Sequence, residues 1–200
     1  MAGRIVVLIS GSGSNMAALV EACRRRDLPG EVVAVVADRD CLGVDLAAGY
    51  DIETVKLEPV GFSSREEWSA ALRDRVADFE PDLVVSAGFM RILSPVFVDA
   101  FTGRLINLHP SLLPAFPGAH AVRDALAAGA KETGTTVHFV DNEVDHGVII
   151  AQERVPIEAD DTEEALHERI KEREHELLPR VCRDLLKGKV RRPGADSDAG

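Results

Sequence analysis

The sequence is poor in cysteine, in aromatic residues and in long hydrophobic runs. Its three cysteines, Cys23, Cys41 and Cys182, are odd in number, far apart and without C-x-x-C spacing. That usage fits reduced thiols and argues against a structural zinc site. The first apolar run, residues 5–9, is too short for the core of a signal peptide, and no apolar stretch is long enough to cross a membrane. We therefore expect a soluble, cytoplasmic protein with neither a metal nor a membrane partner.

Positive charge is also scarce. The chain has 23 Lys and Arg residues against 34 Asp and Glu residues, which gives a formal net charge of −11. Proteins that bind a duplex or a transfer RNA normally present a basic face. We therefore expect small-molecule substrates rather than nucleic acid, with room for a local cationic pocket. The oligomeric state stays open, and a homodimer is one of the alternatives.

The pattern of apolar residues predicts an α/β protein. A length of 200 residues with 46% hydrophobic content is enough for one domain with a sizeable core. Short apolar runs rich in β-branched residues alternate with segments of helical periodicity, which is typical of a parallel sheet with crossover helices. We expect a doubly wound, Rossmann-like, mostly parallel sheet that becomes mixed in its C-terminal part. A single domain would cover residues 1–187, followed by a polar, mobile tail over residues 188–200.

The expected elements follow from these patterns. Strands are predicted over residues 4–10, 31–37, 52–57, 82–87, 104–108, 135–140 and 147–152, the last of them antiparallel. Helices are predicted over residues 14–26, 41–49, 63–79, 120–128 and 161–187. Two of these helices begin with a capping pattern, Ser64 before Glu67 and Asp161 before Glu164. Ligands are expected at the carboxyl ends of the parallel strands.

A glycine-rich loop, Gly-Ser-Gly-Ser-Asn at residues 11–15, joins the first strand to the first helix. Glycines allow a tight turn and a close approach, and a helix N-terminus offers unpaired N–H groups to an anion. The loop lacks the lysine of a Walker A motif, and Met16 stands where a dinucleotide fingerprint has its third glycine. Asp38 comes late for the ribose-binding acid of that fingerprint. The loop therefore favours a phosphate site over a plain strand–helix turn.

Two polar residues end the fifth predicted strand. Asn107 and His109 are two positions apart and so project from the same side of the strand, at the sheet edge where ligands bind. A strand-end histidine bonded to the backbone is the alternative, and the spacing leaves both open. Asp145 lies in an acidic segment, residues 141–147, next to His146, with which it could pair. Spacing alone does not place Asp145 beside His109.

One acid interrupts the apolar stripe of the last predicted helix. Glu174 follows Ile170 by four residues, on the stripe made by Leu166, Ile170, Leu177, Val181 and Leu185. A buried carboxylate needs a partner. An ion pair with Arg173 or Arg180, or exposure near a break at Pro179, is favoured by spacing over a contact to a polar ligand.

Four segments together resemble the phosphoribosylglycinamide formyltransferase family. They are Ile-Ser-Gly-Ser-Gly-Ser-Asn at 9–15, Ala-Gly-Phe-Met-Arg-Ile-Leu at 87–93, Asn-Leu-His-Pro-Ser-Leu-Leu-Pro at 107–114 and Val-Asp-His-Gly at 144–147. The third segment is also found in other formyl-transferring enzymes, whereas the first two are narrower. The resemblance extends over residues 4–187, with departures at Ser12, His146 and Lys171.

The resemblance implies an activity and a set of site residues. The enzyme would move the formyl group of 10-formyltetrahydrofolate, without a metal, to the amine of 5′-phosphoribosylglycinamide in de novo purine (IMP) biosynthesis. The amine would attack directly, through a tetrahedral intermediate. Asn107, His109 and Asp145 would be catalytic, and Gly13, Ser14, Asn15, Lys171 and Glu174 would bind the phosphorylated substrate. Arg65, Met90, Arg91, Ile92, Leu93, Asn107 and Asp141 would bind the folate.

Three alternatives share part of this pattern. A 10-formyltetrahydrofolate hydrolase would use the same trio with water as acceptor, and would normally carry an additional N-terminal domain. A methionyl-tRNA formyltransferase would need a second, basic domain, for which residues 188–200 leave no room. A non-catalytic nucleotide-binding module would explain the glycine loop but not the pairing of Asn107 with His109.

Overall fold

The computed structural model describes residues 2–194 and shows one seven-stranded sheet. The strand order is β3-β2-β1-β4-β5-β6-β7. The strands are β1 (Gly3–Ile9), β2 (Gly30–Ala37), β3 (Glu53–Lys56), β4 (Leu83–Ala87), β5 (Leu105–His109), β6 (Glu132–Phe139) and β7 (Ile149–Pro156). Strands β1 to β5 are parallel, which confirms the predicted fold class.

The C-terminal part of the sheet is mixed, as predicted. Strand β6 pairs antiparallel with both β5 and β7. The predicted antiparallel strand, β7, pairs antiparallel with β6. The sequence did not show that β6 is itself antiparallel to β5, so that β7 again runs in the direction of β5. The reason is that the connections on both sides of β6 reverse the chain, and two reversals restore the original direction.

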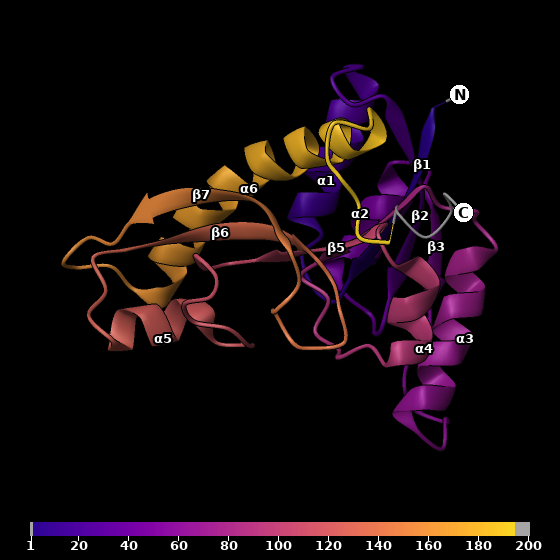
Figure 1. Cartoon of the computed structure of the whole chain (residues 1–200), viewed down its shortest axis with the longest axis horizontal. Helices are drawn as coiled ribbons and strands as arrows, with labels where there is room; N and C mark the ends of the chain where they lie inside the picture. Colours follow the sequence, from indigo (N-terminus) through magenta and orange to yellow (C-terminus); the bar gives the residue numbers. More distant parts are fainter. Residues whose placement is uncertain (1, 195–200) are drawn as a thin grey trace.

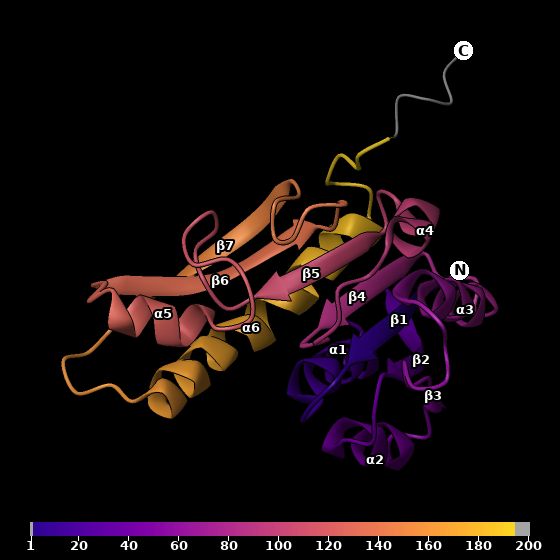
Figure 2. The ribbon, with the colours of Figure 1, turned by 90° about the horizontal axis from the view of Figure 1, so that it is seen from below.

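Helices cover both faces of the sheet (Figures 1 and 2). They are α1 (Ser14–Arg24), α2 (Leu42–Gly49), α3 (Arg65–Ala77), α4 (Pro95–Val98), α5 (Ala121–Ala127) and α6 (Glu163–Leu186), with a 3₁₀ turn η1 (Asp99–Phe101). Helices α1 and α6 pack side by side on one face, and α3 packs beside α4 on the other. Side chains of β1 alternate between two cores: Ile5, Val7 and Ile9 face α1 and α6, whereas Val6 and Leu8 face α3 and α4.

The ends of the helices show which predicted caps form. The Ser64 hydroxyl accepts the Glu67 amide at 3.1 Å, which confirms the predicted start of α3. The predicted cap of α6 is wrong, because Thr162 accepts the Ala165 amide and is the N-cap. The Asp161 carboxylate instead binds the guanidinium of Arg169, 2.7 Å away. A charged partner is the stronger competitor for this carboxylate.

The last predicted helix, over residues 161–187, forms as one element, and one short helix was not predicted. Helix α6 continues through Pro179, so the alternative of a break there is wrong. A proline removes one hydrogen bond, and the buried neighbours Leu178 and Val181 hold the helix on the sheet. Helix α4 and the turn η1 were not predicted, since four helical residues are too few to show a period of 3.6.

Part of the predicted tail lies against the protein. The Arg192 guanidinium donates to the carbonyl oxygens of Asp82 and Leu185, at 3.2 and 3.3 Å. Residues 195–200 of that tail lie outside the described residues. Among residues 2–194, no helix combines the length and the apolar character needed to cross a membrane.

Candidate active site

A cavity of about 740 Å³ lies where the parallel strands were predicted to place a site. The glycine loop after β1, residues 88–93 after β4 and His109 at the end of β5 all line it. Its remaining walls are residues 118–122, residues 140–145 and one side of α6, which contributes Glu163, His167, Lys171 and Glu174. Segments from most of the chain length therefore meet at one edge of the sheet.

The register of β5 and β6 places Asn107 opposite His138. The distance between the Asn107 amide nitrogen and His138 Nε2 is 3.2 Å. His138 Nδ1–H donates to the Phe139 carbonyl at 2.8 Å, which fixes the ring so that Nε2 faces the Asn107 amide. His138 thus fixes the direction in which Asn107 presents its amide. It was missed in the sequence, where only the pairing of the two strands could have indicated it.

His109 and Asp145, which spacing could not place together, are neighbours. His109 Nδ1 lies 3.4 Å from Asp145 Oδ2, and His109 Nε2 donates to the Phe116 carbonyl at 2.9 Å. Both alternatives for His109 therefore hold at once: the ring binds the backbone and also faces a carboxylate. Only a ring protonated at both nitrogens donates to both acceptors.

Asp145 sits between two imidazole rings. Its Oδ2 accepts the Gly118 amide at 2.8 Å, and its Oδ1 lies 3.7 Å from His138 Nε2. Burial raises the pKa of Asp145, but the His138 ring and the Gly118 amide outweigh burial and hold the pKa below its usual value. His146 does not compete for this carboxylate: its Nδ1 faces Asp141 and Glu143, each at 3.7 Å. Asp145 therefore stays ionised and directed at His109 and His138.

The Glu174 side chain is buried, and its hydrogen-bond partners are uncharged polar side chains. The prediction of an ion pair with Arg173 or Arg180, or of exposure, is therefore wrong. The Asn15 amide donates to Glu174 Oε2 at 2.8 Å, and the Thr135 hydroxyl lies 3.4 Å from Oε1. The two arginines pair elsewhere, Arg173 with Glu176 and Arg180 with Glu153. Spacing could not show this, because the partners come from α1 and β6. Burial raises the pKa of Glu174, against the opposing hydrogen bonds of Asn15 and Thr135.

The glycine loop has the geometry of an anion site. Gly13 has φ +76°, and a Cβ there would lie 2.7 Å from the Cα of Gly43 in α2. Gly13 is also the N-cap of α1, so no side chain covers the first N–H groups of this helix, which begins at Ser14 and Asn15. Across the cavity, Lys171 is held by Glu168, with Nζ 2.6 Å from Oε1.

The predicted folate residues divide into two groups. Residues 90–93 and Asp141 line the cavity, together with Asn107. Arg65 lies outside this lining, at the start of α3, where its guanidinium is 3.5 Å from Glu66. The structure therefore brings together all the predicted site residues except Arg65.

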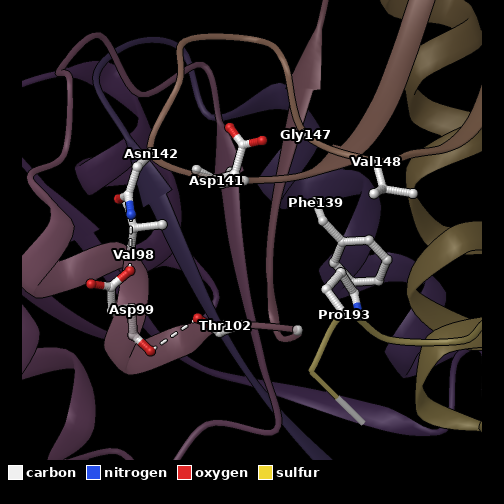
Figure 3. A pocket seen from close by; sticks show the side chains of 11 residues that line it. Val98, Asp99, Thr102, Phe139, Asp141, Asn142, Gly147, Val148 and Pro193 are labelled. Carbon is white, nitrogen blue, oxygen red and sulfur yellow. Dashed lines mark hydrogen bonds between the residues drawn. The ribbon is translucent and has the colours of Figure 1, made fainter. Parts of the chain in front are cut away.

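A smaller cavity of about 160 Å³ lies behind residues 139–148. Figure 3 shows Phe139, Val148 and Pro193 on one side of it, and Asn142 with its hydrogen bond to Asp99 on the other. Asn107, His109 and Asp145 are not part of its lining. The larger cavity is therefore the candidate active site. In the described part of the chain, no group of three or more His, Cys, Asp or Glu side chains could hold a metal ion.

Comparison with known proteins assigns the class. The family model described as formyl transferase matches residues 3–182, and the chain belongs to this family. A relative from Mycobacterium tuberculosis, named phosphoribosylglycinamide formyltransferase, is 51% identical over 175 residues, which cover 88% of this chain and 81% of the relative. A relative of the same name from Escherichia coli is 44% identical, covering 94% and 89%.

Solved structures agree with these relatives. The structure of glycinamide ribonucleotide transformylase 1 from Symbiobacterium toebii superposes with a TM-score of 0.93 at 42% identity, over 96% of this chain and 91% of that one. A phosphoribosylglycinamide formyltransferase from Bacillus halodurans gives a TM-score of 0.90 at 38% identity, over 94% and 97%. The resemblance noted in the sequence motifs is thereby confirmed.

Proposed function

We propose that this protein transfers the formyl group of 10-formyltetrahydrofolate to the amine of 5′-phosphoribosylglycinamide, a step of purine biosynthesis. The observation that carries the proposal is the meeting of Asn107, His109 and Asp145 in one cavity, between a glycine loop and residues 88–93. The relatives named above are transferases and lend no support to the alternative of a hydrolase.

The phosphorylated amine fits the end of the cavity formed by the glycine loop and α6. Its phosphate would accept backbone N–H groups at the start of α1, residues 13–15, with Lys171 as a positive charge. Glu174 offers a buried carboxylate to hydroxyl or amine hydrogens of the same substrate. Asn15 Oδ1, buried and without a donor among the described residues, offers a further acceptor. An unpaired buried acceptor of this kind supports a ligand that brings its own donor.

The folate fits the opposite end. Residues 90–93 have no helix or strand, so their backbone groups, apart from the Met90 N–H that donates to Ser10, are not engaged in a ladder and can match the edge of a heterocycle. Asp141 adds a carboxylate on the facing loop. When bound, the folate supplies the formyl group. Arg65 stays a predicted folate contact that the cavity does not reach.

The residues between the two ends stabilise charge and hold protons. An amine that attacks a formyl carbon places negative charge on the formyl oxygen, and the Asn107 amide N–H is a donor for it. A protonated His109 would be a second, charged donor, once its Nε2–H turns from the Phe116 carbonyl. Removing one such donor costs about 10²–10³ in rate. Collapse of the tetrahedral intermediate breaks the bond between the formyl carbon and the folate nitrogen, and the proton leaving the amine reaches that departing nitrogen directly or through water held by Asp145. Direct transfer needs no nucleophilic serine or cysteine, only alignment of the substrates.

A formyl-transfer assay tests the proposal. Purified protein is given 10-formyltetrahydrofolate with and without 5′-phosphoribosylglycinamide, and tetrahydrofolate release is followed. We expect release only with the amine, together with the formylated amine as product. Release that is equally fast without the amine would establish the hydrolase instead.

The setting of the enzyme follows from this reaction. We infer a cytoplasmic location and small-molecule partners, in keeping with free thiols at Cys23, Cys41 and Cys182. The homodimer remains a prediction, which gel filtration with light scattering would test.

A further inference from the structure

Asp38 is a buried carboxylate that the proposed reaction does not use. It follows β2 directly, and its side chain is fully shielded from solvent. A buried charge is costly unless it is paired and hydrogen-bonded. Two guanidinium groups pair with it: Arg39 Nη2 at 2.9 Å and Arg91 Nε at 2.6 Å. Asp38 therefore holds two arginines in place at the carboxyl edge of the sheet.

The two arginines lie differently with respect to the cavity. Arg91 belongs to residues 88–93, which line the cavity, whereas Arg39 lies outside the lining. Asp38 itself also lies outside it. Any effect of Asp38 on a ligand must therefore act through the neighbours that it holds.

Ser10 joins the same network from β1, the strand between β2 and β4. Its hydroxyl accepts the Met90 amide at 2.8 Å, and its own amide donates to the Gly88 carbonyl at 3.2 Å. Burial raises the pKa of Asp38, but hydrogen bonds from Arg39, Ser10 and Arg91 outweigh burial and keep the carboxylate ionised. The ends of three adjacent strands are thus tied together by one charge.

Residues 88–93 depend on such ties. They form no helix or strand. Phe89 and Leu93 pack against the core, but Met90 and Ile92 are 62% and 58% exposed, so apolar packing does not fix the stretch between Phe89 and Leu93. Where a stretch has neither a ladder of backbone hydrogen bonds nor buried apolar side chains, specific polar contacts hold its shape. The two anchors from neighbouring strands are Asp38, through Arg91, and Ser10, through Met90.

We infer that Asp38 is a positioning residue, which through Arg91 holds residues 88–93 in the shape that receives the formyl donor. The inference rests on the proposed function, which places the folate along this wall. The phosphorylated amine lies at the other end of the cavity, so its binding should not depend on Asp38. Asp38 thereby sets the affinity for one of the two substrates.

The variant Asp38→Asn keeps the size of the side chain and removes its charge. We expect the KM for 10-formyltetrahydrofolate to rise about tenfold, equivalent to about 1.4 kcal/mol, with the KM for 5′-phosphoribosylglycinamide unchanged. The Kd for tetrahydrofolate, measured by calorimetry, should rise in parallel, and this readout needs no turnover. Hydrogen exchange should show a less protected Met90 amide.

Three further variants keep the test sharp. Asp40→Asn removes a nearby exposed carboxylate, paired with Lys56 at 2.8 Å, and should change neither KM. Ser10→Ala removes the second anchor and should raise the same Kd if Asp38→Asn does not fold. In an Arg91→Gln background, Asp38→Asn should add little, because the effect passes through Arg91.

Two results would overturn the inference: an unchanged Kd for tetrahydrofolate in both Asp38→Asn and Ser10→Ala, or an equal rise of both KM values. Failure of the proposed function looks different. In that case the wild type would bind tetrahydrofolate, and the variants would bind it more weakly, yet no formyl transfer to the amine would be seen.

Discussion

The side-chain amide of Asn15 donates to the Glu174 carboxylate over 2.8 Å and so joins the first turn of α1 to the middle of α6. The amide nitrogen is therefore engaged within the protein, and Oδ1 is the atom of this side chain left without a partner in the described residues. In the proposed site, Asn15 would contribute a backbone N–H to the phosphate, while its side chain holds Glu174. The two residues form one unit at the end of the cavity assigned to the phosphorylated amine.

Asn15→Ala should weaken the binding of the phosphorylated substrate more than the binding of the folate. The substitution leaves the buried Glu174 carboxylate without its best donor, and a hydrogen bond to a charged group contributes about 1.5–3 kcal/mol. We expect the KM for 5′-phosphoribosylglycinamide to rise about 10- to 100-fold, which corresponds to that energy. Steady-state kinetics with each substrate varied in turn would measure it. Equal changes in both KM values would contradict the assignment of the glycine loop.

Glu174→Gln should change how stability depends on pH. Burial raises the pKa of Glu174 in the folded state, so its ionised form is disfavoured there. The stability of the wild type relative to the variant is therefore largest below the unfolded pKa, about 4.3, and falls as pH rises through the folded value. Urea unfolding at a series of pH values would measure this trend.

The same variant has a matched control and a second readout. Glu176→Gln removes an exposed carboxylate two residues on, 3.9 Å from Arg173, and should show no such trend. Glu174→Gln should also raise the KM for the phosphorylated amine. A difference from the wild type that is constant across the pH range would refute the raised pKa.

Asp145→Asn should lower turnover by about two orders of magnitude or more, the scale of a lost oxyanion donor. Without the carboxylate, the charged form of His109 loses its partner, while the Gly118 amide still finds an acceptor in the new side chain. The fold should therefore be nearly unchanged by circular dichroism. His146→Ala is the control, since His146 is exposed and faces Asp141 and Glu143, and it should keep normal turnover. Near-normal turnover in Asp145→Asn would remove Asp145 from the mechanism.

Thr162→Ala should destabilise the protein by about 1 kcal/mol, the usual contribution of a threonine N-cap. The Thr162 hydroxyl accepts a hydrogen bond from the Ala165 amide at 3.1 Å. The methyl group of an alanine cannot accept this hydrogen bond. For a protein of this size, the melting temperature should fall by about 2–4 °C. Calorimetry would measure the shift, with Ser64→Ala, which removes the corresponding cap of α3, as a comparison. An unchanged melting temperature would mean that the hydroxyl does not cap α6.

The sequence predicted the features that depend on interactions between residues close together in the chain. The β-branched run of β1, the Ser64 cap and the common direction of Asn107 and His109 all follow from spacings of a few residues. The location of the site followed as well, because parallel strands place their carboxyl ends at one edge.

The remaining features depend on pairings between distant segments. His138 enters the site only through the register of β6 against β5, and the partners of Glu174 come from α1 and β6. At the start of α6, Asp161 pairs with Arg169, and Thr162 is the N-cap instead. Both residues are suitable N-caps by type and position, so the sequence alone does not show which of them caps the helix.

The antiparallel pairing of β5 with β6 sets Asn107 against His138 and His109 against Thr136. A slip of one residue would turn every side chain of β6 to the opposite face. Catalytic competence should therefore require that these two strands pair in this register. A partly folded chain that already has its first five strands would still be inert.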